Sequence, residues 1–304
     1  MTDMFQDLIE IDSFMDAVHL TGAAYVLLLL IVLLVARKVF DLASPYQLAE
    51  ELTSHDNKAI ALSFGGFLFG AGLIVQTVLS HDSHSLPGST DNAQDSFLFL
   101  FDLLSTTLWS FLGIILLLVA RFINDKLLLS TFDNTKELVT DRNLGTGAVE
   151  CGSFVGSAVM IQAALSGSES QFFVSLLATL VFFALGQAGF IAFGLIFQKV
   201  ARFDLHGEIE KDNVAAGVSF GLNLIAIGVL LSGYLKSADS ALGFLIWFVF
   251  ATLIILACRY FVDKVILPGD LLDEEISRDQ NWGAGLVEGL CSIALAIIVT
   301  ASFF

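Results

Sequence analysis

Positive charge is scarce in this sequence. Its 304 residues include 14 Lys and Arg against 31 Asp and Glu, which gives a formal net charge of −17. Nucleic-acid phosphates and anionic lipid headgroups both bind clusters of Lys and Arg, so this balance argues against either kind of polybasic surface. We expect no nucleic-acid partner, and we expect cations as small charged partners.

Residues that usually carry chemistry are also few. The three cysteines, Cys151, Cys258 and Cys291, lie in or beside apolar segments without metal-like spacing, so the sequence indicates neither a disulfide framework nor a metal site. It has no glycine-rich nucleotide loop after a strand and no nucleophile paired with a base. We therefore expect no cofactor, no metal and no enzyme activity.

Residues 1–16 contain several acids and no Lys or Arg, whereas a cleavable signal peptide begins with positive charge. Apolar residues alternate with these acids. We expect residues 1–16 to form an extracytoplasmic amphipathic segment at the membrane interface.

Hydrophobic residues are abundant, at 56% of the chain, and charged residues make up 15%. A membrane-spanning helix needs about 20 mostly apolar residues. Eight stretches qualify: 18–36, 58–79, 97–120, 144–165, 171–198, 214–235, 240–258 and 282–302. The sequence therefore predicts an all-α membrane protein with eight transmembrane helices.

The loops predict how these helices cross the membrane. Thirteen of the fourteen Lys and Arg residues lie between an odd-numbered helix and the next even-numbered one, and only Lys236 lies elsewhere. Lys and Arg are retained in cytoplasmic loops during insertion. We expect both termini to lie outside the cytoplasm and the protein to be a multi-pass protein of the cell inner membrane.

The chain repeats a two-helix hairpin four times, over residues 17–80, 97–166, 171–236 and 239–304, which we call units 1 to 4. Asparagine opens the second helix of each unit, as a predicted N-cap: Asn57, Asn143, Asn213 and Asn281. Small residues follow four and eight positions later, and they favour close helix packing: Ala61/Gly65, Gly147/Cys151, Gly217/Gly221 and Gly285/Gly289. We expect parallel repeats with the even-numbered helices at the centre.

The four strings that carry this pattern are HDNKAIALSFG, DRNLGTGAVEC, KDNVAAGVSFG and DQNWGAGLVEG. They resemble a bacterial inner-membrane family known as domain of unknown function three-fifty (YjfL-like), whose unit is such a hairpin. The resemblance covers nearly the whole chain, as a fused pair of two-hairpin proteins. It implies an association with envelope or membrane stress and no established activity.

Seven residues after the asparagine, units 2 and 4 carry Glu150 and Glu288, where units 1 and 3 carry Phe64 and Phe220. A carboxylate about two turns inside an apolar helix must be protonated, paired or hydrated. Nineteen residues after the asparagine, each unit has a second polar position: Gln76, Gln162, Ser232 and Thr300. One interpretation is a cation or proton pathway lined by both sets. The other is structural, with each glutamate protonated, hydrogen-bonded or paired with a basic side chain such as Arg142.

Two functions remain open at this point. The first is a channel or transporter for protons, monovalent cations or small polycations. The second is a non-catalytic scaffold or anchor that binds cytosolic membrane-stress proteins or associates with itself. For the second, the acidic residues Asp270, Asp273, Glu274 and Glu275 are the expected docking site for a basic partner.

Overall fold

The computed structural model describes residues 20–81, 93–166, 172–237 and 240–304, and this part of the chain is helical without any strand. The expected segment 1–16 lies outside the described residues. The long helices are α3 (Leu20–Ala43), α5 (Lys58–His81), α6 (Ala93–Leu127), α8 (Leu144–Leu165), α9 (Phe172–Val200), α11 (Val214–Lys236), α12 (Ala241–Phe261) and α14 (Trp282–Phe303). The short elements are α4 (Leu48–Thr53), α7 (Asn134–Val139), α10 (Leu205–Glu210), the π-helix η1 (Val262–Ile266) and α13 (Leu272–Ser277).

Within the described residues, seven helices are long and apolar enough to cross a membrane. They correspond to the second through eighth predicted stretches. α3, with 24 residues, lies where the first crossing is expected. α9 runs without interruption through Gly186, Gln187 and Gly189, so the fifth stretch is one continuous helix.

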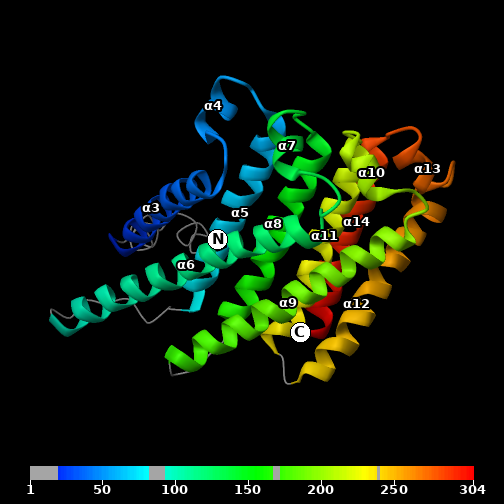
Figure 1. Ribbon diagram of the computed structural model, residues 1–304. Helices are drawn as coiled ribbons and strands as arrows, with labels where there is room; N and C mark the ends of the chain where they lie inside the picture. Colours follow the sequence, from blue (N-terminus) through cyan, green and yellow to red (C-terminus); the bar gives the residue numbers. More distant parts are fainter. Residues whose placement is uncertain (1–19, 82–92, 167–171, 238–239) are drawn as a thin grey trace, which may run out of the picture.

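The helices that begin after an asparagine form a row. α5 packs against α8, α8 against α11, and α11 against α14. α6 contacts α5 and α8, α9 contacts α8 and α11, and α12 contacts α11 and α14, so these helices bridge successive members of the row (Figure 1). The short helices α4, α7, α10 and α13 gather at one end of the molecule, which we call the short-helix end (Figure 1).

Burial along the row corrects one expectation. α8 and α11 are central, with 78% and 72% of the residues in their apolar windows buried. α14 is only 22% buried, less than the bridging helices α6 and α12 at 39%. The prediction that every even-numbered helix lies at the centre is therefore wrong for α14, because the row is open and α14 is its last member.

Glycines allow the row's backbones to touch. A Cβ atom added to Gly152 would lie 2.1 Å from the Gly221 carbonyl oxygen, and one added to Gly217 would lie 2.3 Å from that of Gly145. Such distances are possible only without a side chain, so small residues set the spacing of the row. Gly147 and Gly285 make similar approaches, to the carbonyl oxygens of Ala59 and Ala215 at 2.6 Å in both cases. The expected pair Ala61/Gly65 is the exception, because both residues are exposed.

This packing predicts a large effect for one added methyl group. We expect Gly152→Ala to lower the free energy of unfolding by at least about 1–3 kcal/mol, because the new Cβ meets backbone atoms that cannot rotate away. Gly72→Ala is the matched control, since a Cβ atom there meets nothing within 4 Å. Thermal unfolding in detergent micelles measures both, and equal midpoints would contradict direct backbone contact.

Candidate functional site: two buried carboxylates in the helix row

Each asparagine joins its long helix to the short helix before it. The side-chain oxygen accepts a backbone N–H bond in the first turn, from Ile60, Thr146, Ala216, or both Gly283 and Ala284. The side-chain nitrogen donates to a glutamate of the short helix at 2.8–3.0 Å: Glu51, Glu137, Glu208 and Glu275. The residue before each asparagine has a left-handed φ of 49–60°, which turns the chain into the helix.

Three of the asparagines also reach the next unit. Asn57 donates to the Leu138 carbonyl oxygen at 2.8 Å, and Asn143 donates to that of Ile209 at 2.6 Å. Asn213 donates to the Ile276 carbonyl oxygen at 2.9 Å. These three residues are buried, whereas Asn281 is exposed and has no next unit to reach. The asparagines therefore fix the register of each helix on both of its neighbours at the short-helix end.

The asparagine bond affects the charge of these glutamates differently in units 1 and 2. Burial by itself raises the pKa of Glu51, but the hydrogen bonds to Asn57 and His55 outweigh burial and lower it. A carboxylate that accepts hydrogen bonds is favoured as the anion. At Glu137 burial outweighs the hydrogen bond from Asn143, and the pKa is raised.

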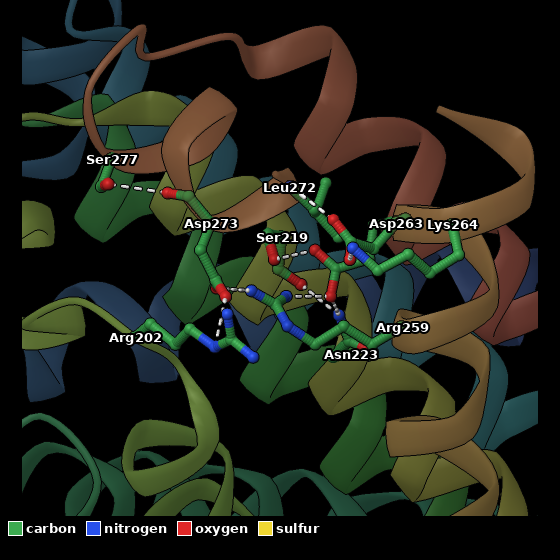
Figure 2. A network of polar contacts seen from close by, with 10 residues as sticks. Arg202, Ser219, Asn223, Arg259, Asp263, Lys264, Leu272, Asp273 and Ser277 are labelled. Atoms are coloured by element: carbon green, nitrogen blue, oxygen red, sulfur yellow. Dashed lines mark hydrogen bonds and ion pairs between the residues drawn. The ribbon is translucent and has the colours of Figure 1, made fainter. Parts of the chain in front are cut away.

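Glu288 lies on α14 and is fully buried between α11 and α12. Arg259 on α12 forms an ion pair with its Oε1 atom, and Ser219 donates to Oε2 at 2.6 Å. Asn223 donates to Oε1 at 3.3 Å. Figure 2 shows these side chains converging from α11 and α12. Glu288 is therefore paired and hydrogen-bonded, which compensates its removal from water.

Arg259 continues this network toward the short-helix end. Its Nη2 atom lies 2.5 Å from Asp273, and its guanidinium stacks over the Phe197 ring at 5.1 Å from the centroid. Asp273 is partly exposed and also lies 4.0 Å from Arg202 (Figure 2). One arginine thus neutralises a fully buried carboxylate and links it to a group that solvent reaches.

Glu150 occupies the same position on α8 with fewer partners. Ser63 on α5 donates to Oε2, while Oε1 has no hydrogen-bond partner among the described residues. Arg121 on α6 is close enough to interact electrostatically with Glu150. It also contacts Asp125 at 3.9 Å and stacks over Phe40 at 4.6 Å from the ring centroid. Arg121 thus compensates the charge of Glu150, but Oε1 of Glu150 remains without a hydrogen bond among the described residues.

The two arginines belong to the candidate site, and sequence reasoning missed them. Arg121 lies 22 residues before Asn143, and Arg259 lies 22 residues before Asn281. Units 1 and 3, which lack the glutamate, have Val35 and Ile191 at that offset. The paired occurrence of arginine and glutamate was the signal that could have found them. The basic partner considered from sequence, Arg142, instead has the left-handed backbone before Asn143.

A line of polar groups extends from Glu150 along α8. Asn124 on α6 donates to Ser153 at 2.5 Å, and Gln187 on α9 donates to Ser157 at 3.2 Å. All four side chains are buried. The side-chain oxygens of Asn124 and Gln187, like Oε1 of Glu150, have no hydrogen-bond partner among the described residues. Buried acceptors without donors are costly, so three in one line indicate a place for a proton, a cation or water.

The second half of the chain does not repeat this line. At the offsets of Ser153 and Ser157, α14 carries Cys291 and Leu295, and at the offset of Asn124, η1 begins with Val262. Two buried oxygens near Glu288 lack a hydrogen-bond partner among the described residues: the side-chain oxygen of Asn223 and the hydroxyl of Ser292, one turn further along α14. The two carboxylates therefore lie in different surroundings: Glu150 leads into a polar line and Glu288 ends in an ion pair.

The second predicted polar position forms two pairs. Gln162 donates to Gln76 at 3.2 Å and also to the Leu73 carbonyl oxygen. In the second half, Ser232 and Thr300 both donate to the Val229 carbonyl oxygen, at 2.8 and 3.3 Å. The four residues therefore form one pair in each half of the chain: Gln76 with Gln162, and Ser232 with Thr300. Gln76 and Gln162 lie at the end of the polar line that is farthest from Glu150.

The expected acidic docking site is partly paired within the chain. Arg278 pairs with Asp270 at 3.3 Å and with Glu274 at 2.7 Å. Asp273 is bound to Arg259, and Glu275 accepts from Asn281. Arg278 is also shared with Asp279 and Asn281 is neutral, so the cluster keeps a net negative charge. A basic partner at this site stays a prediction.

Comparison with known proteins identifies the family. The model described as Domain of Unknown Function (DUF350) matches residues 11–165 and again residues 171–303. The chain belongs to this family. Each match covers one half of the chain, one with Glu150 and the other with Glu288.

Two relatives share this family's membrane character. The DUF350 chain is 22% identical over 262 residues to a UPF0719 transmembrane protein of Aquifex aeolicus, covering 84% of this chain and 89% of that protein. It is 25% identical over 111 residues to the UPF0719 transmembrane protein YshE of Bacillus subtilis, covering 36% and 81%. No solved structure matches the chain. The protein is thus a multi-pass α-helical membrane protein.

Proposed function

We propose that this protein conducts protons or small monovalent cations across the cell inner membrane, along the polar groups that line α8. The observation that carries the proposal is the line of buried acceptors formed by Glu150, Asn124 and Gln187. Intramembrane acids of this kind commonly mark ion pathways or proton relays. Oxygen acceptors also replace the hydration shell of a cation.

The polar line covers part of the membrane thickness. Glu150 lies seven residues after the Asn143 cap, about 10 Å along α8. Gln162 lies about 28 Å along the helix, so the line from Glu150 to Gln162 is about 18 Å long, against roughly 30 Å for the hydrocarbon core. Ser153 and Ser157 fall between them. The polar groups therefore extend across a little more than half of the hydrocarbon core.

Charge decides which ions are favoured. Glu150 faces this line with an unpaired oxygen, and an anion there would meet a carboxylate at short range. Arg121 is already shared between Glu150 and Asp125, which limits its attraction for an anion. A cation or a proton is therefore the ligand that best satisfies the unpaired oxygens of the line.

The proposal assigns a different role to Glu288. Its ion pair with Arg259 and its bonds to Ser219 and Asn223 hold α14 and α12 on α11. This arrangement satisfies the carboxylate without a mobile ion. In this proposal Glu288 stabilises the second half, while the short-helix end, rich in Lys and Arg, faces the cytoplasm.

Flux into liposomes tests the proposal. Purified protein in vesicles with a pH or potassium gradient should collapse that gradient faster than protein-free vesicles, and Asn124→Leu with Gln187→Leu should slow it. Chloride gradients should be unaffected. Rates equal to those of empty vesicles for both protons and potassium would reject conduction and leave the non-catalytic scaffold as the better account.

A further inference from the structure

The helix row ends in two exposed faces that complement each other. We number positions in each unit by their distance along the chain from its asparagine, so that +2 is two residues after it. At each internal junction, residues +2, +9 and +13 of one unit contact residues +4, +8 and +15 of the next unit, in that order. Thus Gly147 at +4 meets Ala59 at +2, Gly289 at +8 meets Leu222 at +9, and Gly228 at +15 meets Gly156 at +13. Small residues on at least one side of each contact permit this close approach.

Unit 4 presents the first set of offsets without a partner in the part of the chain that the structure describes. Its residues are Gly283, Leu290 and Ala294. Leu290 is 51% exposed and Ala294 is exposed, while a Cβ atom on Gly283 would meet only the Asn281 side chain within 4 Å. The equivalent residues of unit 3 are covered by α14. Leu222, at the offset of Leu290, packs against Gly289.

Unit 1 presents the second set without a partner among the described residues. Its residues are Ala61, Gly65 and Gly72. Ala61 and Gly65 are exposed, and Cβ atoms on Gly65 and Gly72 would meet nothing within 4 Å. In units 2 to 4, glycines at the +4 offset instead meet the backbone of the preceding unit.

The short-helix end shows the same incompleteness. A groove of about 450 Å³ there is lined by Asp270, Glu275, Asn281, Gly283 and Val287, among others. In unit 3 the residues equivalent to the last three are Asn213, Ala215 and Ser219, all at most 1% exposed, because unit 4 covers them. The groove therefore lies where a following unit packs at every internal junction.

We propose that copies of this chain associate head to tail, with α14 of one copy against α5 of the next. The contact continues the internal row with the same register: Gly283 meets Ala61, Leu290 meets Gly65, and Ala294 meets Gly72. Leu290 on Gly65 reproduces the packing of Leu222 on Gly289.

The hydrogen bond from asparagine to the next unit can also form between two copies. In this contact the Asn281 side-chain nitrogen donates to the Leu52 carbonyl oxygen of the next copy. Leu52 is the equivalent acceptor because it follows Glu51 directly, as Leu138 follows Glu137. At the internal junctions that carbonyl accepts from Asn57, Asn143 and Asn213. Since each copy has both faces, the contact is heterologous and can repeat from copy to copy. This inference does not rest on the proposed conduction.

Disulfide cross-linking in native membranes tests the contact. Two chains with Cys151, Cys258 and Cys291 replaced by alanine carry either Gly72→Cys or Ala294→Cys, and different tags. At an internal junction the equivalent Cβ positions, at Gly70 and Ala158, are 3.0 Å apart, near the roughly 3.5–4.5 Å of a disulfide. We expect cross-linked dimers from the mixture and none from either variant alone.

Leu253→Cys on α12 is the control for random collision, because Leu253 is 58% exposed and belongs to neither α5 nor α14. Cross-linking of Gly72→Cys to Leu253→Cys at the same rate would overturn the proposal. Dimers of Ala294→Cys alone would indicate back-to-back packing of α14 and would also overturn it. Absence of cross-links in every combination would show that lipid covers these faces.

Discussion

Glu150→Gln is expected to reduce proton or cation flux to the level of protein-free liposomes. The substitution keeps the size of the side chain and an acceptor for Ser63, but it removes the charge and the titratable proton. Because Oε1 of Glu150 has no other partner among the described residues, little packing is lost. The loss therefore reports on conduction, measured as the decay of a pH or potassium gradient.

Folding provides the control for this variant. Glu150→Gln should lower the thermal unfolding midpoint less than Glu288→Gln does, because Arg121 interacts with Glu150 electrostatically without the close ion pair that joins Arg259 to Glu288. Ser63→Ala should keep both the fold and a partial flux. A folded Glu150→Gln protein with undiminished flux would remove Glu150 from the pathway.

Glu288→Gln is expected to act on stability. Arg259 is buried within α12, and loss of its carboxylate leaves it with the partly exposed Asp273 alone. Removal of one member of a buried ion pair typically costs about 3–5 kcal/mol, because the remaining charge is uncompensated. Chemical or thermal unfolding in micelles measures this loss.

Two further variants show whether pairing is the cause. The double variant Arg259→Leu with Glu288→Leu should recover most of the lost stability, since it removes both charges together. Glu274→Gln changes an exposed ion pair with Arg278 and should cost at most about 1 kcal/mol. If Glu288→Gln were no worse than Glu274→Gln, the ion pair would not be holding α14.

Much of the architecture could be predicted from local patterns. Apolar length and helix-opening asparagines are local features, so the long helices and the N-cap bonds of the four asparagines follow from sequence. The position of α14 could not be predicted in this way. Similar units are compatible with a closed bundle or an open row, and the difference depends on contacts between distant segments.

The candidate site was only half visible in the sequence. Glu150 and Glu288 were conspicuous because charge inside an apolar span is rare. Their different surroundings depend on α6, α9 and α12, which cross the row and bring Asn124, Gln187 and Arg259 to it. The angles at which these helices cross the row determine which neighbour an amide or guanidinium contacts. The spacing of residues within one helix contains no information on these angles.

Water access to Ser157 tests the conduction account most directly. This residue is fully buried at about 21 Å along α8, between Glu150 and Gln162. In a chain without its native cysteines, Ser157→Cys should react with a small, cationic, water-soluble thiol reagent in membrane vesicles. Ala296→Cys, equally buried on α14, should not react. If Ser157→Cys stays as unreactive as Ala296→Cys, no hydrated path follows the polar line and the proposed function is wrong.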